Sequence, residues 1–194
     1  MILHLIGNGP SIKHFPLDAE GTRIGCNFSD EKYNCAWTFI ADIKPIKSIY
    51  EGQRLPCPAI LSDRANDFIE KKAFKPDPRN IEIYKVVPFI KRKDIHKRWG
   101  MNSAQHAVWY GLEEFKPKEI HLWGCDSLWS SDITSATDKI VHKDLDFMNG
   151  TEVYYTWRDY WNYIIDINRH TKFIIHGYQK PDLKEEINMI WEKL

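Results

Sequence analysis

Small and polar residues that could bind an anion follow the first apolar run of the sequence. The run Ile2–Ile6 ends in Gly7, Asn8, Gly9, Pro10 and Ser11. Glycines at the end of a first strand let backbone N–H groups approach an anion closely, and Ser11 can cap a following helix. The loop lacks the third glycine of the dinucleotide fingerprint, because position 12 is Ile, and no Gly-Lys-Ser/Thr of a P-loop follows. These residues indicate either a nucleotide site of another type or a tight structural turn.

Other apolar runs also end on a polar or acidic residue. These residues are Asn27, Asp42, Asp63 and Asp126. The carboxyl ends of parallel strands meet at one edge of an open α/β sheet, where ligands bind, so we expect these side chains to converge. Asn27 could read a base or ribose, and Asp42 or Asp126 a sugar hydroxyl. Taken singly, each residue is also explained by turn chemistry or helix capping.

A second candidate anion site lies at the start of the clearest helical pattern, Asn102–Phe115, where apolar residues recur at helical spacing. Asn102 and Ser103 are good N-cap residues, and the free N–H groups and dipole of a helix start favour an anion. The preceding segment 91–99 holds five cations and Trp99, with Arg98 the best placed to neutralise a leaving phosphate. The same segment could be a solvated helix face, or could contact DNA with Trp99 stacked on a base.

Short β-branched strands separated by turn residues must position these groups. We expect strands at Ile2–Ile6, Thr22–Cys26, Ala36–Ala41, Pro58–Leu61, Ile81–Val87, Ile120–Trp123 and Lys172–Ile175. Helical periodicity is clearest at Asn102–Phe115, Thr156–Asn168 and Asp182–Leu194. This alternation predicts an α/β fold: a Rossmann-like, doubly wound, mainly parallel sheet with helices on both faces. The long stretch of about 127–151, rich in Ser, Thr and Asp, is expected to be a lid-like loop.

Composition narrows the class of protein. The 194 residues are enough for a single domain, 1–194, with a sizeable core, and their 43% hydrophobic and 28% charged shares are those of a globular protein. Balanced charges, 27 basic against 27 acidic residues, argue against nucleic-acid binding through the overall field. Four cysteines without zinc spacing and the lack of a signal peptide or membrane span lead us to expect a cytoplasmic protein.

Eight tryptophans are more than a small core readily hides, so several are expected at a cleft or a partner surface, including that of a homo-oligomer. Trp123, Trp129, Trp157 and Trp161 could form an aromatic floor for a sugar or base. An indole at helical spacing is more often part of the core.

Several ordered motifs, which together cover about two thirds of the chain, resemble a known family. They are Leu5–Ile12, Gly25–Phe28, Trp37–Asp42, and a block that runs from Asn102-Ser-Ala-Gln-His-Ala to the Gly-Cys-Asp at Asp126. This order resembles the bacterial sialyltransferases of glycosyltransferase family 42, and also the related 6-hydroxymethylpterin pyrophosphokinase-like family. The resemblance implies a Rossmann-like fold in which the glycine loop, Asn8 and Asn27 hold a nucleotide sugar, CMP- or UDP-linked. It places Asn102 and Ser103 at the nucleotide phosphate.

The chain also departs from the family pattern. Ser127-Leu128-Trp129 stands where the family has phosphate-binding tyrosines, and Tyr154-Tyr155-Thr156 occupies the region of the family's catalytic histidine. Tyr155 is therefore a further candidate for the nucleotide site. The base that deprotonates an acceptor hydroxyl is left to His142 or Asp126, with Asp144 and Asp146 next. The Asp144-Leu-Asp146 pattern could hold Mg²⁺ or Mn²⁺. Such a short pattern is common by chance and the resembled sialyltransferases need no metal, so no required cofactor is expected.

These residues favour a nucleotide-sugar-dependent glycosyltransferase that moves a sugar to an acceptor hydroxyl, on a glycan or a modified nucleobase. Two alternatives stay open. One is a pyrophosphokinase-like phosphotransferase that uses ATP, which would give the loop carboxylates a role. The other is a nucleotide-binding or nucleic-acid-binding module without catalysis, which would account for the missing family histidine and tyrosines.

Overall fold

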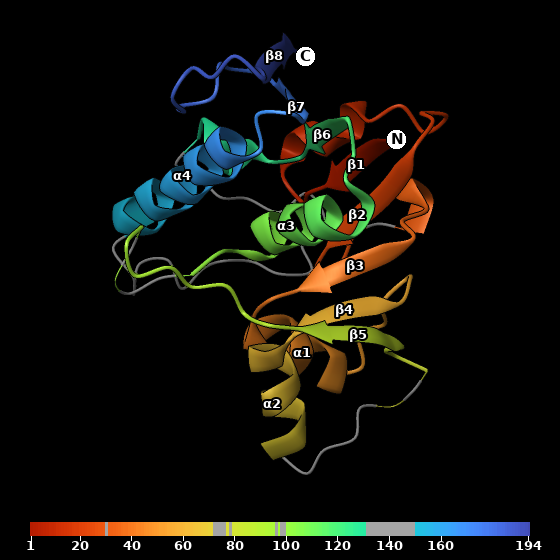
Figure 1. Ribbon diagram of the computed structural model, residues 1–194. Helices are drawn as coiled ribbons and strands as arrows, with labels where there is room; N and C mark the ends of the chain where they lie inside the picture. The colour runs from red at the N-terminus through yellow and green to blue at the C-terminus, as the bar shows by residue number, and fades with distance from the viewer. Residues whose placement is uncertain (30, 72–76, 78, 96, 98–99, 131–149) are drawn as a thin grey trace.

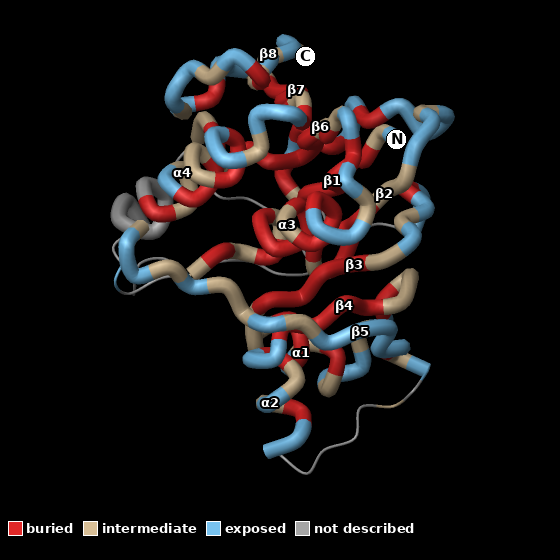
Figure 2. The backbone as a smooth tube through the Cα atoms, in the orientation of Figure 1, coloured by how far each residue is buried: buried red, intermediate tan, exposed pale blue. Residues whose placement is uncertain are grey.

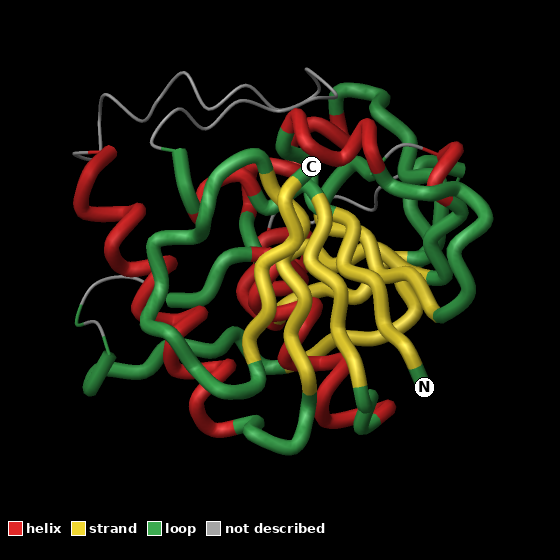
Figure 3. The backbone as a smooth tube through the Cα atoms, turned by 90° about the horizontal axis from the view of Figure 1, so that it is seen from above, coloured by secondary structure: helices red, strands yellow, loops and turns green. Residues whose placement is uncertain are grey.

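One parallel sheet of eight strands forms the centre of the computed structural model. The structure describes residues 1–29, 31–71, 77, 79–95, 97, 100–130 and 150–194, except for the side chains of 150–155. The strand order is β5-β4-β3-β2-β1-β6-β7-β8, and every neighbouring pair is parallel. The strands are β1 (Ile2–Ile6), β2 (Thr22–Cys26), β3 (Trp37–Ile40), β4 (Ala59–Ser62), β5 (Ile83–Val87), β6 (Glu119–Trp123), β7 (Lys172–Gly177) and β8 (Met189–Lys193). Seen from above, they run side by side through the middle of the molecule (Figure 3).

Alternate residues of each strand pack on opposite faces of the sheet, because side chains point to opposite sides with a period of two. On one face, Leu3 and Leu5 pack with α3 (Ser103–Phe115) and α4 (Gly150–Ile167). On the other face, Ile40 and Leu61 pack with α1 (Ile43–Tyr50) and α2 (Asp63–Lys71). The buried positions run through the strands from β1 to β4, whereas the edge strand β5 is largely exposed (Figure 2).

The sheet is doubly wound, as the sequence predicts. The chain moves outward from β1 through β2, β3 and β4 to β5, then crosses with α3 to β6 on the other side of β1 (Figure 1). The winding therefore reverses between β1 and β6. In open α/β sheets this reversal point, at the carboxyl ends of the strands, is where ligands bind. The Rossmann-like fold class is thus confirmed, and it directs attention to the loops after β1 and β6.

The predicted C-terminal helix at Asp182–Leu194 is wrong. Residues Met189–Lys193 form β8, which pairs with β7 in the register Phe173 to Met189. The Asn188 side-chain amide anchors the start of this strand by donating to the carbonyls of Ile165, Asn168 and Thr171. Pairing with the open edge of β7 thus overrides the helical periodicity, because tertiary context outweighs local propensity.

The other two predicted helices are found, α3 with nearly the predicted bounds and α4 with an earlier start. The Thr156–Asn168 pattern belongs to α4, which begins earlier, at Gly150. The short helices α1 and α2 were not singled out, because eight and nine residues offer little periodicity. Of the expected loop at 127–151, residues 131–149 lie outside the described residues, and Asp126–Leu128 form a 3-10 turn, η3. No described helix is both long and apolar enough to cross a membrane.

Candidate functional site

The loops that follow β1 and β6 are packed directly against each other. A Cβ atom on Gly7 would lie 2.4 Å from the Gly124 carbonyl oxygen, and one on Gly124 would lie 2.7 Å from the Gly7 oxygen. Gly124 also has a positive φ of 65°, a conformation that glycine adopts without strain. Glycine is therefore needed at both positions for the backbones to approach. The two loops are therefore in backbone contact at the point where the winding of the sheet reverses.

The glycine loop uses most of its N–H groups to hold this contact. Gly7 N–H donates to the Trp123 oxygen and Gly9 N–H to the Gly124 oxygen, at 2.7 and 2.8 Å. Ser11 N–H donates to Asp126 Oδ2 at 2.9 Å, and Pro10 has no N–H group. Of this loop, only Asn8 has an N–H group without an acceptor among the described residues. The expectation that the amides of Gly7–Ser11 surround an anion is therefore wrong in its details, because three of them are already donated to the β6 side.

Asp126 anchors the glycine loop rather than facing a substrate. Its side chain is buried, Oδ2 accepts the Ser11 N–H, and Oδ1 has no hydrogen-bond partner within the described residues. Burial raises the pKa of this carboxyl above its ordinary value. A general base must touch the proton that it removes. The geometry thus favours a positioning role for Asp126 over the catalytic role expected from the sequence.

A pair of substitutions separates these roles. We expect Asp126→Ala to lower the free energy of unfolding by about 1–3 kcal/mol, because it leaves the buried Ser11 N–H without an acceptor. Asp126→Asn keeps an acceptor and removes a buried charge, so its stability should equal or exceed that of the wild type. Urea denaturation measures both, with the exposed Asp18→Ala as control. An Asn variant as unstable as the Ala variant would contradict the positioning role.

A row of polar side chains lies along the carboxyl edge from the end of β1 to α3, and each is held by a hydrogen bond. Asn8 Nδ2 donates to the Cys26 carbonyl oxygen at 2.8 Å. The next residue, Asn27, accepts at Oδ1 from the Ser103 hydroxyl at 3.0 Å. Asn27 has a left-handed φ of 54°, which turns its side chain at the end of β2 toward the helix. The structure therefore brings Asn8, Asn27 and Ser103 together, as the sequence leads one to expect.

The start of α3 is capped, yet it keeps free donors. Asn102 Oδ1 accepts the Gln105 N–H and Gln105 Oε1 accepts the Asn102 N–H, both at 2.9 Å, which completes a capping box. The N–H groups of Ser103 and Ala104 have no acceptor in the described part of the chain. Because these donors point along the helix axis at its positive end, they suit a phosphate or another anion.

His106 locks the helix start to the segment that follows β5. Its Nδ1–H donates to the Asn102 carbonyl oxygen at 2.9 Å, and Nε2 accepts the Ile90 N–H at 2.8 Å. These two backbone partners require the neutral imidazole, because a protonated ring could not accept the Ile90 bond. Burial lowers the pKa of His106 to about 4. The histidine fixes the geometry of the helix start, and neither ring nitrogen is free to bind a ligand. A lone histidine inside a helical pattern gives no signal for this role.

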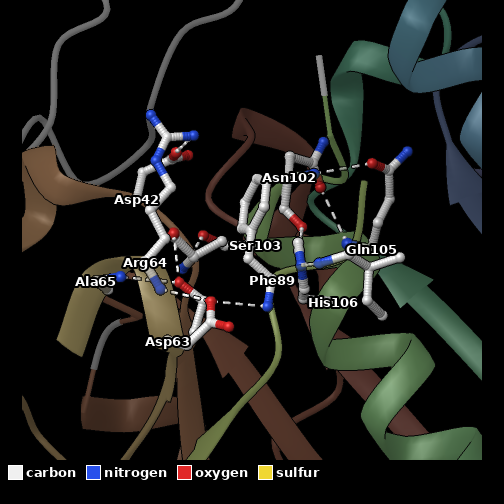
Figure 4. Close-up of polar contacts among 12 residues, drawn as sticks. Asp42, Asp63, Arg64, Ala65, Phe89, Asn102, Ser103, Gln105 and His106 are labelled. Atoms are coloured by element: carbon white, nitrogen blue, oxygen red, sulfur yellow. Dashed lines mark hydrogen bonds and ion pairs between the residues drawn. The ribbon is translucent and has the colours of Figure 1, made fainter. Parts of the chain in front are cut away.

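Asp42, Asp63 and Arg64 form a charged group beside the helix start (Figure 4). Arg64 Nη1 lies 3.6 Å from Asp42 Oδ1, and its guanidinium stacks 5.2 Å from the Phe89 ring centre. Asp63 Oδ1 accepts the Phe89 N–H at 2.9 Å. The Phe89 ring stands between Arg64 and His106. Asp42 is thus at the predicted edge, paired with a cation that the sequence analysis missed although Arg64 directly follows the polar end of β4.

The remaining candidates divide into two groups. His142, Arg98, Asp144 and Asp146 lie outside the described residues, as does the side chain of Tyr155. The expected aromatic floor is wrong, because Trp161, which lies on α4, is buried against one face of the sheet while Trp123 packs on the opposite face. In the described ranges, no three His, Cys, Asp or Glu side chains are grouped to hold a metal ion.

Three comparisons complete the description of this site. Comparison of the chain with protein-family models, curated proteins and solved structures yields no match in any of the three. The polar groups at the carboxyl edge are therefore the features that bear on function.

Proposed function

We propose that this protein is a nucleotide-sugar-dependent glycosyltransferase that moves a sugar to an acceptor hydroxyl. The observation that carries the proposal is the polar row at the carboxyl edge, where Ser103 donates to Asn27 and Asn8 donates to the carbonyl of the neighbouring Cys26. This row ends at the two free N–H groups of α3. It offers amide groups for a base or ribose beside donors for a phosphate, which is the pairing of groups that a nucleotide needs.

The proposed reaction is one direct displacement. The acceptor oxygen forms a bond to the anomeric carbon, the bond from that carbon to the donor phosphate breaks, and the phosphate leaves with the electron pair. The Ser103 and Ala104 N–H groups and the dipole of α3 stabilise the developing negative charge. Arg64, on the same edge, supplies positive charge that partly offsets Asp42. The hydroxyl proton passes to a base, for which His142 is our candidate now that Asp126 is found buried.

The donor in this proposal is CMP- or UDP-linked, and the acceptor is a glycan or a modified nucleobase in DNA.

A second candidate function is a nucleotide-binding module without catalysis. The burial of Asp126 favours it, because that carboxylate cannot reach an acceptor without movement of the loop.

Asn27→Gly is the sharpest test of the nucleotide site. Glycine adopts the left-handed conformation freely, so the free energy of unfolding should change by less than about 1 kcal/mol. The variant loses the amide, and nucleotide affinity should fall about tenfold, the value of one good hydrogen bond. Asn34→Gly is the matched control, because Asn34 also has a positive φ, 48°, and lies at the end of η2 (Glu31–Tyr33). Equal affinity in the Asn27 variant and the wild type would remove Asn27 from the site.

Incubation with CMP-, UDP- and GDP-linked sugars tests the reaction itself. Ion-exchange chromatography should show release of the free nucleotide from one donor, and His142→Ala should abolish that release while nucleotide binding persists. Binding without release from any donor, with glycan or DNA acceptors present, would favour the binding module. Consumption of ATP with release of AMP would instead favour the pyrophosphokinase-like alternative.

A further inference from the structure

A groove lies between the edge strand β5 and helix α3. Its volume is about 230 Å³. One side is lined by Lys85, Val87, Pro88 and Ile90. The other side is lined by the α3 residues His106, Trp109, Tyr110, Glu113 and Glu114, and Phe39 also contributes. Most of this lining is aromatic or aliphatic, and ionisable groups gather at one end. The volume is below that of drug-sized pockets and suits a small molecule with one ring.

Two carboxylates stand at the charged end of the groove, in the last turn of α3. Glu113 and Glu114 line the groove, and that last turn contains no basic residue. Negative charge is unfavourable at a helix carboxyl end, because the helix dipole is negative there. The Trp109 indole N–H donates to Glu113 Oε1 at 2.7 Å, and Glu113 has no cationic partner within the described residues. The arrangement concentrates negative potential beside aromatic rings.

The ammonium group of Lys85 shows that this end of the groove accommodates a cation. Its ammonium lies 3.1 Å from Glu114 Oε2 and 5.1 Å from the centre of the Tyr110 ring. Both contacts favour a cation, the first by charge and the second by the electrons of the ring face. Lys85 is on the exposed edge strand, with its side chain 43% exposed, so holding it there costs rotamer freedom. An added cation could replace it, or bind beside it at Glu113.

We propose that the groove binds a small organic cation, an amine carried on an apolar or aromatic body. The amine lies against Glu113 and Glu114, where the carboxylates and the helix dipole act together. The body packs against Trp109, Tyr110 and Val87. An anionic ligand is excluded on charge, because two carboxylates and a helix carboxyl end outweigh the single Lys85 ammonium. This inference is independent of the proposed transferase activity, and the groove meets the carboxyl edge at His106 and at Pro88 and Ile90, which follow β5.

Phenethylamine and phenylacetate test the sign of the charge, because both carry the same ring. We follow backbone amide shifts by NMR during titration of the full chain. The cation should bind at least about tenfold more tightly than the anion and shift the amides of 85–87, 89, 90 and 106–114. Comparable or tighter binding of phenylacetate overturns the proposal, as does a titration in which phenethylamine gives no saturable shift there.

Two variants test the assigned groups. Lys85→Met removes the internal ammonium but keeps an aliphatic side chain, so phenethylamine should bind about threefold more tightly or better. Glu113→Gln should weaken phenethylamine binding about threefold or more. Lys118→Met and Glu51→Gln, at exposed positions away from the groove, are the matched controls and should leave affinity unchanged. Weaker binding of the cation by Lys85→Met, or no effect of Glu113→Gln, overturns the assignment.

Discussion

Gly7→Ala should destabilise the protein by about 3 kcal/mol and abolish nucleotide binding. The added Cβ would lie 2.4 Å from the Gly124 oxygen and 2.8 Å from the Trp123 oxygen, both backbone atoms of the β6 side. Overpacking of a fixed contact usually costs about 1–3 kcal/mol, and here neither backbone can move without breaking the Gly7 N–H bond to Trp123. Urea denaturation gives the loss of stability, and nucleotide titration gives the loss of binding.

Gly111→Ala is the matched control for this prediction. Its Cβ would also lie 2.4 Å from another atom, but that atom is the terminal methyl Cδ2 of Leu3, a rotatable group. Alanine also stabilises a helix by about 1 kcal/mol relative to glycine. We therefore expect the stability of this variant to stay within about 1 kcal/mol of the wild type. Equal losses of stability in Gly7→Ala and Gly111→Ala would contradict a rigid contact between the loops that follow β1 and β6.

Acidification should destabilise the protein between about pH 6.5 and pH 4, with His106 as a major cause. The folded pKa of His106 is lowered to about 4, whereas an unfolded histidine titrates near 6.5. Between about pH 6.5 and pH 4 the His106 ring is protonated in the unfolded chain and neutral in the folded chain. The free energy of unfolding therefore falls as the pH is lowered through this range. A tenfold change in proton affinity is worth about 1.4 kcal/mol, so His106 alone contributes up to about 3 kcal/mol. Above pH 6.5 this contribution is constant.

The measurement is urea denaturation across this pH range, together with NMR titration of the His106 ring. His106→Gln should show a shallower fall with acidification than the wild type. The exposed His170→Gln is the control and should leave the slope unchanged. Burial also lowers the pKa values of His4, His121 and His176, so part of the slope should survive in the His106 variant. A His106 ring that titrates near pH 6.5 would contradict the neutral, doubly bonded state described here.

The sequence predicts the centre of this fold better than its periphery. The buried strands are short apolar runs that end on turn residues, and those patterns place the ends of β1, β2, β6 and β7 within two residues. The C-terminal segment has the spacing of a helix and forms β8 instead, because only tertiary structure reveals that β7 leaves an unpaired edge. Local sequence patterns carry no information about which edge of a sheet a later segment of the chain will pair with.

The same limit applies to the candidate site. The asparagines after β1 and β2 and the cap of α3 are visible in the sequence because turn and cap chemistry is local. The burial of Asp126 depends on the packing of Gly9 against it, at a sequence separation that no local pattern covers. Arg64 acquires its role from Asp42 and Phe89, which come from two other strand ends. Residues that are distant in the sequence and adjacent in the sheet therefore determine the role of each polar side chain. Some of these side chains are left open to a ligand, and others bond to the backbone.

The most direct test of the central claim is NMR titration of the full chain with CMP and UDP. The account predicts saturable binding of at least one nucleotide, with the largest shifts at the backbone amides of Asn8, Ser103 and Ala104, which lack acceptors among the described residues. It also predicts weaker shifts in Asn27→Gly at the same nucleotide concentration. Nucleotides that leave these three amides unmoved, or that bind Asn27→Gly as tightly as the wild type, would contradict a nucleotide site at the carboxyl edge of this sheet.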